Sequence, residues 1–110
     1  MKAGQAIDAL GALAQEHRLK LFRLLVQAGA EGMAAGELAR AIDIPNSSLS
    51  FHLGHLHRAG LIEQRRAGRS LIYSADYRAM DRLVAYLMEN CCGGEGCAPL
   101  ALPAFESESR

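Results

Sequence analysis

A change in the spacing of apolar residues near the middle of the chain limits its fold more than any other feature. The stretch NSSLSFHLGHLHRAGL, residues 46–61, has one narrow apolar stripe at helical spacing. The stripe consists of Leu49, Leu53 and Leu56. The next stretch, LIEQRRAGRSLIYSAD, residues 61–76, contains two β-favouring runs that enclose Ala67 and Gly68, a pattern typical of a hairpin. A short helix that leads directly into a hairpin predicts a mainly α-helical domain with one β-hairpin.

Polar residues begin this predicted helix and also occupy the face opposite its apolar stripe. Asn46, Ser47 and Ser48 are residues that commonly cap free helix N–H groups, so we expect the helix to begin there and to end at Gly60. At about 100° per residue, the side chains that project away from the stripe are Ser47, Phe51, Gly54 and Arg58. The residues that flank the stripe are Ser50, His52 and His55.

Further helices are predicted on both sides of this segment. The stretch AIDALGALAQEHRLKLFRLLVQAG indicates two consecutive helices with a break near residues 15–17 and a stop at Gly29. MAAGELARAI indicates a short helix that Pro45 prevents from continuing. Asp76 can cap a last helix, which has a broad apolar face. This face comprises Met80, Leu83, Val84, Leu87 and Met88.

The formal net charge is zero, but the charges are unevenly distributed along the chain. Residues 52–70 carry four arginines and one glutamate, whereas residues 71–110 carry three basic and six acidic side chains. A zero net charge alone argues against a nucleic-acid partner. The local excess of arginine around the predicted hairpin restores that hypothesis.

The order of these elements is typical of a winged helix-turn-helix, in which the second helix enters the DNA major groove and the hairpin wing contacts DNA beside it. Serine hydroxyls at the helix start can bind bases or phosphates, and Gly54 allows close approach of the backbone. Each feature alone has an ordinary structural explanation, such as helix capping for the serines or core packing for His52. Their order and spacing together favour DNA binding.

The run ELARAIDIPNSSLSFHLGHLHRAGLIEQRRAGRSLIYSAD, residues 37–76, resembles the ArsR (arsenical-resistance repressor) family of metalloregulators. The upstream EHRLKLFRLL resembles an early helix of that family, so the resemblance covers residues 5–90. It implies a winged-helix homodimer, paired through its first and last helices, that represses its own operon until a thiophilic or metal ion binds. It also implies a regulator of double-stranded operator DNA and not an enzyme.

On this basis we expect two groups of contact residues. The predicted DNA contacts are Ser47, Ser48, Ser50, Phe51, His52, His55, Arg58, Arg65, Arg66 and Arg69. The predicted dimer contacts are Ile7, Leu10, Leu13, Met80, Leu83, Val84 and Leu87.

Two ligand sites of the family have no counterpart in this sequence. Arsenic sensors often carry a Cys-x-Cys pair in the helix before the recognition helix, where this chain has Ala34 and Gly36. Other members bind zinc with histidine and carboxylate residues of the last helix, but residues 76–90 contain no histidine. A sensor function would therefore depend on the cysteines near the C-terminus.

All three cysteines lie in ENCCGGEGC, residues 89–97. The intervening glycines allow Cys97 to fold back toward Cys91 and Cys92, so three sulfur atoms can converge. Trivalent arsenic prefers three sulfur ligands in a trigonal pyramid, whereas zinc normally takes four ligands in a tetrahedron. The ligand count favours As(III), or Sb(III), as inducer and requires no catalytic cofactor.

We therefore predict a DNA-binding and dimerisation domain at residues 1–90 and a flexible tail with the arsenic-binding loop at residues 91–110. No charged start precedes an apolar run and no stretch approaches the length of a membrane span, so we expect a soluble, cytoplasmic protein without a membrane partner. Other hypotheses remain open: a response to cadmium, zinc, lead or organic arsenicals, a thiol-redox enzyme or sensor, and a constitutive DNA-binding protein with an idle tail.

Overall fold

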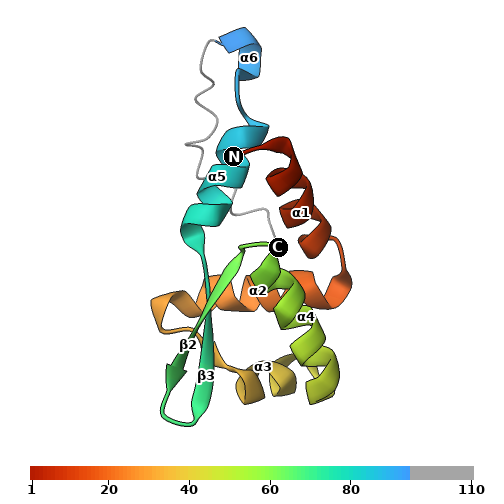
Figure 1. Cartoon of the computed structure of the whole chain (residues 1–110), viewed down its shortest axis with the longest axis vertical. Helices are drawn as coiled ribbons and strands as arrows, with labels where there is room; N and C mark the ends of the chain where they lie inside the picture. Colours follow the sequence, from red (N-terminus) through yellow and green to blue (C-terminus); the bar gives the residue numbers. More distant parts are fainter. Residues whose placement is uncertain (95–110) are drawn as a thin grey trace.

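The computed structural model describes residues 1–94 and contains a helical body with a small antiparallel sheet (Figure 1). The elements in chain order are α1 Ala3–Leu13, α2 Glu16–Ala28, the 3₁₀ turn η1 Gly29–Glu31, β1 Met33–Ala34, α3 Ala35–Ile42, α4 Asn46–Arg58, β2 Ile62–Ala67, β3 Ser70–Ala75, α5 Tyr77–Leu87 and α6 Cys91–Gly94. The predicted winged helix-turn-helix is confirmed, with α3 and α4 as the helix pair and β2 and β3 as the wing.

The helices assemble around a leucine-rich core, as the apolar periodicity predicts. The predicted stripe of α4 is buried, and Leu21 and Leu25 of α2 meet it in the same cluster. The six largest fully buried side chains are all leucines, namely Leu21, Leu25, Leu38, Leu49, Leu56 and Leu61. Burial of such side chains contributes about 1.5–3 kcal/mol each, so this cluster fixes α4 against the body.

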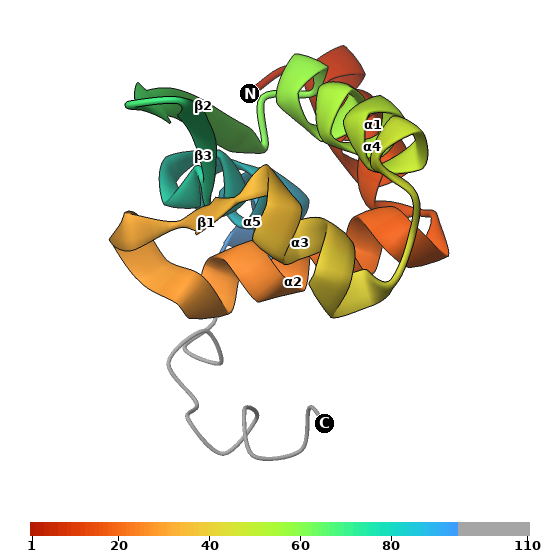
Figure 2. The same ribbon diagram turned by 90° about the horizontal axis from the view of Figure 1, so that it is seen from below.

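The predicted dimer helices and the predicted DNA-binding elements lie at opposite ends of the domain. In Figure 1, α1 and α5 lie together at one end, while α3, the start of α4 and the hairpin tip lie at the other. Seen from below in Figure 2, the hairpin and α4 lie on opposite sides of the view, with α3 between them. The end formed by α3, α4 and the wing is therefore separate from the end formed by α1 and α5.

The sheet has a third strand that the sequence analysis missed. The two-residue β1 pairs antiparallel with β3, and the strand order is β1-β3-β2. Gly32 precedes β1 with φ +71°, and a Cβ at this position would overlap the carbonyl oxygen of Tyr73. Only glycine tolerates both the positive φ and this close approach.

Two local predictions need correction. The hairpin turn consists of Gly68 and Arg69, because Ala67 pairs with Ser70 and belongs to β2. Gly68 adopts φ +65°, which suits its place in the turn. Helix α4 begins at Asn46 as predicted, but Pro45 is the N-cap residue and no side chain caps the helix. Within residues 1–94, the serine hydroxyls of α4 make no hydrogen bond and stay available for a ligand.

Candidate nucleic-acid interface

Helix α4 presents its predicted outward face to solvent. Ser47, Ser50, Phe51 and Arg58 are exposed, whereas Ser48 and His55 are half-buried. The opposite face is fixed by the leucine core, so the exposed face has a defined orientation. A rigid helix with small polar and basic side chains on its open face is suited to contact base edges and phosphates.

The structure corrects the prediction that His52 faces DNA. Its side chain is only 9% exposed, and its Nδ1 lies 3.3 Å from Nη1 of Arg18. Burial and, secondarily, the Arg18 guanidinium lower the pKa of His52 below its ordinary value, and His17 and His55 act in the same direction. A neutral ring can accept a hydrogen bond from the guanidinium, so His52 joins α4 to the body of the domain.

Arg18 is a buried residue that holds α4 in place and that the sequence analysis missed. It is 8% exposed, and its Nε donates a 2.7 Å hydrogen bond to the carbonyl oxygen of Ala12 at the end of α1. The guanidinium therefore connects α1, α2 and α4. The spacing did contain a signal, because Arg18 lies at i−3, i−4 and i−7 from Leu21, Phe22 and Leu25, which form the buried face of α2.

The three predicted wing arginines have different environments. Arg66 and Arg69 are exposed, and within residues 1–94 neither forms a hydrogen bond or ion pair. Arg65 donates through Nη2 to the carbonyl oxygen of Glu31, at 3.0 Å. It therefore ties the wing to η1. Arg65 is also exposed, so DNA contact by all three wing arginines stays a prediction.

The predicted dimer residues divide into an exposed set and a buried set. Ile7 and Leu10 of α1 and Val84 and Leu87 of α5 are exposed. Leu13 and Met80 are half-buried against the core. The structure corrects the assignment of Leu83, which is buried within its own protomer. The exposed apolar side chains of the first and last helices are available for a partner, since α1 and α5 lie together at one end (Figure 1).

The predicted ligand cysteines begin just beyond the last long helix. Asp76 caps α5 as predicted, by accepting a 3.1 Å hydrogen bond from the Ala79 amide. Cys91 is half-buried and a free thiol, and its amide donates to the carbonyl oxygen of Met88, at 2.9 Å. Cys92 is exposed and disulfide-bonded. Cys97, like the rest of the tail from residue 95, lies outside the described residues, so convergence of the three sulfur atoms stays a prediction.

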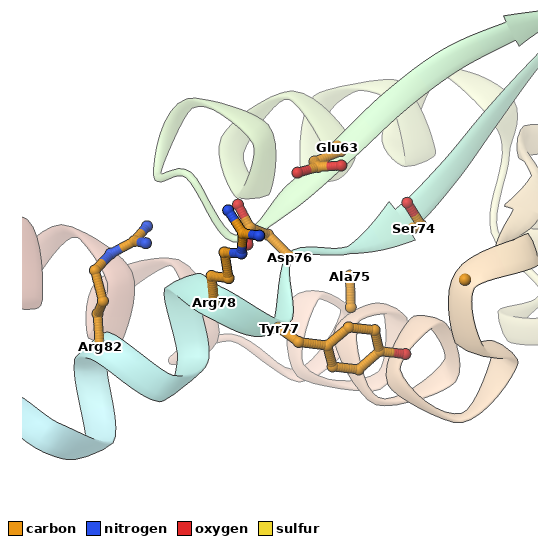
Figure 3. Close-up of a pocket in the computed structure, with 8 residues that line it drawn as sticks. Glu63, Ser74, Ala75, Asp76, Tyr77, Arg78 and Arg82 are labelled. Atoms are coloured by element: carbon orange, nitrogen blue, oxygen red, sulfur yellow. The ribbon is translucent and has the colours of Figure 1, made fainter.

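A cavity of about 500 Å³ lies between the base of the wing and α5 (Figure 3). Arg78 and Arg82 extend from α5 on one side, and Glu63 and Asp76 lie nearby. The cavity contains no cysteine or histidine and does not coincide with the predicted ligand site. Across residues 1–94, no group of three histidine, cysteine, aspartate or glutamate side chains is arranged to hold a metal ion.

The fold and the open face of α4 define a protein of the winged helix-turn-helix class, a DNA-binding architecture. A family model described as a helix-turn-helix domain matches residues 13–65. The HTH-type transcriptional regulator YgaV of Escherichia coli (strain K12) is 32% identical over 90 residues, which cover 82% of this chain and 89% of that protein. A Halobacterium salinarum protein named "Putative arsenical resistance operon repressor ArsR" is 36% identical over 86 residues. The match covers 74% of this chain and 66% of the Halobacterium protein.

Solved structures agree with these sequence relatives. An ArsR-like transcriptional regulator from Rhodococcus sp. RHA1 superposes with a TM-score of 0.71 at 25% identity, covering 97% of this chain and 96% of its own. The homodimeric winged helix-turn-helix domain of Mb0332 from Mycobacterium bovis superposes with a TM-score of 0.65 at 26% identity. The match covers 77% of each of the two chains. Reduced HlyU from Vibrio cholerae superposes with a TM-score of 0.63 at 26% identity. The match covers 82% of this chain and 92% of the HlyU chain. The chain belongs to the ArsR family of transcriptional regulators. Its described helices include none long and apolar enough to span a membrane.

Proposed function

We propose that this protein is a homodimeric repressor that binds double-stranded operator DNA through α4 and the wing. The observation that carries the proposal is that Ser47 and Ser50 are exposed on the open face of α4, and that the wing presents Arg66 and Arg69, which are exposed and unpaired within residues 1–94. The α4 residues would contact base edges and phosphates in the major groove, and the wing arginines would contact phosphates beside it. The relatives named as transcriptional regulators support this assignment.

This DNA interface can be tested by the salt dependence of operator affinity. A phosphate contact contributes about 0.9 to the slope of log K against log salt. The proposed homodimer carries two copies of each side chain, so Arg66→Ala and Arg69→Ala should each reduce the slope by about 1.8. Arg23→Ala removes an exposed arginine of α2, outside the proposed interface, and should leave the slope unchanged. Equal slopes for the wild type and both wing variants would contradict the interface.

The proposed inducer is As(III), or Sb(III), held by Cys91, Cys92 and Cys97. Arsenous acid exchanges three hydroxyl groups for three thiolate sulfurs, and each exchange transfers one thiol proton to the departing hydroxyl to give water. The chemistry requires all three cysteines as thiols, so the Cys92 disulfide must first be reduced. The relative named as an arsenical resistance operon repressor supports the choice of ligand class.

The position of Cys91 suggests how ligand binding would reach the DNA. The Cys91 amide is hydrogen-bonded to Met88, directly after α5, and α5 carries the exposed Val84 and Leu87. Closing the loop around arsenic would alter this end of α5 and hence the contact between protomers, which sets the spacing of the two α4 helices. A hundredfold loss of operator affinity requires about 2.8 kcal/mol of coupling.

X-ray absorption at the arsenic edge tests the ligand set on reduced, arsenite-loaded protein. We expect three sulfur neighbours in the wild type. We expect a mixed sulfur and oxygen shell in each single variant Cys91→Ser, Cys92→Ser and Cys97→Ser. An oxygen or nitrogen neighbour in the wild type, or three sulfurs in all variants, would overturn the site. Zinc, cadmium or lead binding with proton release would instead favour a divalent-ion sensor.

A second candidate, a thiol-redox regulator, is favoured by one specific observation, the Cys92 disulfide. One structural relative is described as reduced HlyU, which supports including this candidate. The two candidates differ in an operator titration without arsenite. A redox regulator should bind with different affinities when oxidised and reduced, whereas the arsenic sensor responds only when arsenite is added.

A further inference from the structure

Phe51 is a large apolar side chain placed where the proposed repressor would meet DNA. It is 61% exposed and lies on the outward face of α4, opposite the leucine stripe. It is more exposed than any other phenylalanine or tyrosine in the described part of the chain. A ring exposed on this face can gain free energy by burying its apolar surface against a ligand.

Neighbouring side chains restrain the Phe51 ring. Its centroid lies 5.3 Å from the ring of His52 at an interplanar angle of 68°, and 6.4 Å from the ring of His55 at 72°. His52 in turn contacts Arg18, which is hydrogen-bonded to the end of α1. Edge-to-face contacts of this kind favour one ring orientation, so binding a ligand to Phe51 costs little additional side-chain entropy.

On its N-terminal side Phe51 is flanked by small polar residues. Ser47 lies one turn before it and Ser50 precedes it directly, whereas on the other side the Arg58 side chain lies over Gly54. Small neighbours let the ring approach the floor of a groove that is about 12 Å wide. In that groove the one apolar group on the bases is the C5-methyl of thymine, and phenylalanine is among the side chains that contact it.

We propose that Phe51 is a specificity-determining residue that selects a thymine in each operator half-site by contact with its C5-methyl group. This inference rests on the proposed DNA-binding function. It goes further by assigning one base type to one side chain. Serine and arginine neighbours would supply the hydrogen bonds, and Phe51 would supply the apolar part of the recognition.

The test replaces each thymine of an operator selected from random DNA by deoxyuridine, which removes only the methyl group. For the wild type we expect one position per half-site where the substitution weakens binding about fourfold, as burial of one methyl-sized group predicts. Phe51→Ala should bind the operator more weakly and should lose the penalty at that position. Leu19→Ala, which truncates an exposed leucine of α2, should keep the wild-type penalty.

The outcomes separate this inference from the proposed function. If the wild type binds the operator but no deoxyuridine weakens binding, or if Phe51→Ala keeps the same penalty, the role of Phe51 is overturned while operator binding stands. If the wild type selects no DNA sequence, both proposals fail. Phe51→Ala should melt as a folded protein at a slightly lower temperature than the wild type, because it loses the ring contacts with His52 and His55. The deoxyuridine penalty is a ratio measured within each variant, so its loss reports on DNA contact.

Discussion

Replacement of Arg18 by methionine should destabilise the domain because Arg18 joins three helices. Methionine retains the apolar stem, so the change removes mainly the hydrogen bond to Ala12 and the contact with His52. A hydrogen bond from a charged donor is worth about 1.5–3 kcal/mol, and a buried acceptor left unpaired adds to the loss. Relief of the cost of burying a guanidinium offsets part of this loss. We expect a net decrease in the free energy of unfolding of about 1–3 kcal/mol.

Thermal unfolding followed by circular dichroism measures this effect, at one protein concentration because dimer formation would make the midpoint concentration-dependent. For a domain of this size, each kcal/mol of lost stability lowers the midpoint temperature by about 4–8 °C. The matched control is Lys20→Met on the same helix, which removes the exposed 3.2 Å ion pair with Glu16 and should cost no more than about 0.5 kcal/mol. A midpoint for Arg18→Met equal to that of Lys20→Met would refute the structural role of Arg18.

Three further predictions concern pH, backbone conformation and assembly. Burial lowers the pKa of His52 below 6.5, so His52 binds a proton more readily in the unfolded chain than in the folded one. The free energy of unfolding should therefore fall as the pH decreases below about 6.5. In melting curves recorded over a series of pH values, His52→Gln should show a smaller fall. Gly32→Ala should destabilise the domain by more than about 1 kcal/mol, because φ is positive at this position and the new methyl overlaps the Tyr73 carbonyl. The control Gly4→Ala lies in α1, where a Cβ meets no neighbour, and should not destabilise. Equal denaturant midpoints for the two variants would contradict this prediction. Leu87→Glu should convert the expected dimer to a folded monomer in sedimentation analysis, and an unchanged mass would exclude this face.

The sequence was most informative where periodicity and turn chemistry act locally. The α4 stripe, the stop at Gly29, the Asp76 cap and the hairpin follow from residues close together in the chain, and the structure confirms each. The hairpin turn was displaced by one residue, because Ala67 fits equally well in a strand or a turn. Short-range patterns thus identified the elements better than their boundaries.

Features that depend on distant contacts could not be read from local patterns. Strand β1 has only two residues and exists because Met33 and Ala34 pair with β3, about forty positions later. Helical spacing places His52 at the edge of the apolar stripe of α4. Its burial also depends on the contact with Arg18 of α2, which is 34 residues away in the sequence. The hydrogen bond from Arg65 to a carbonyl oxygen of η1 joins residues 34 positions apart and could not be predicted from local pattern.

The most direct measurement of the central claim is a titration of the preformed operator complex of reduced protein with arsenite, followed by fluorescence anisotropy. We expect arsenite to release the DNA, with operator affinity reduced about a hundredfold, as coupling of about 2.8 kcal/mol allows. The variant with Cys91, Cys92 and Cys97 all changed to serine should bind the operator equally well and retain it at every arsenite concentration. A wild-type complex that is indifferent to arsenite, or a serine variant that is released like the wild type, would contradict the account.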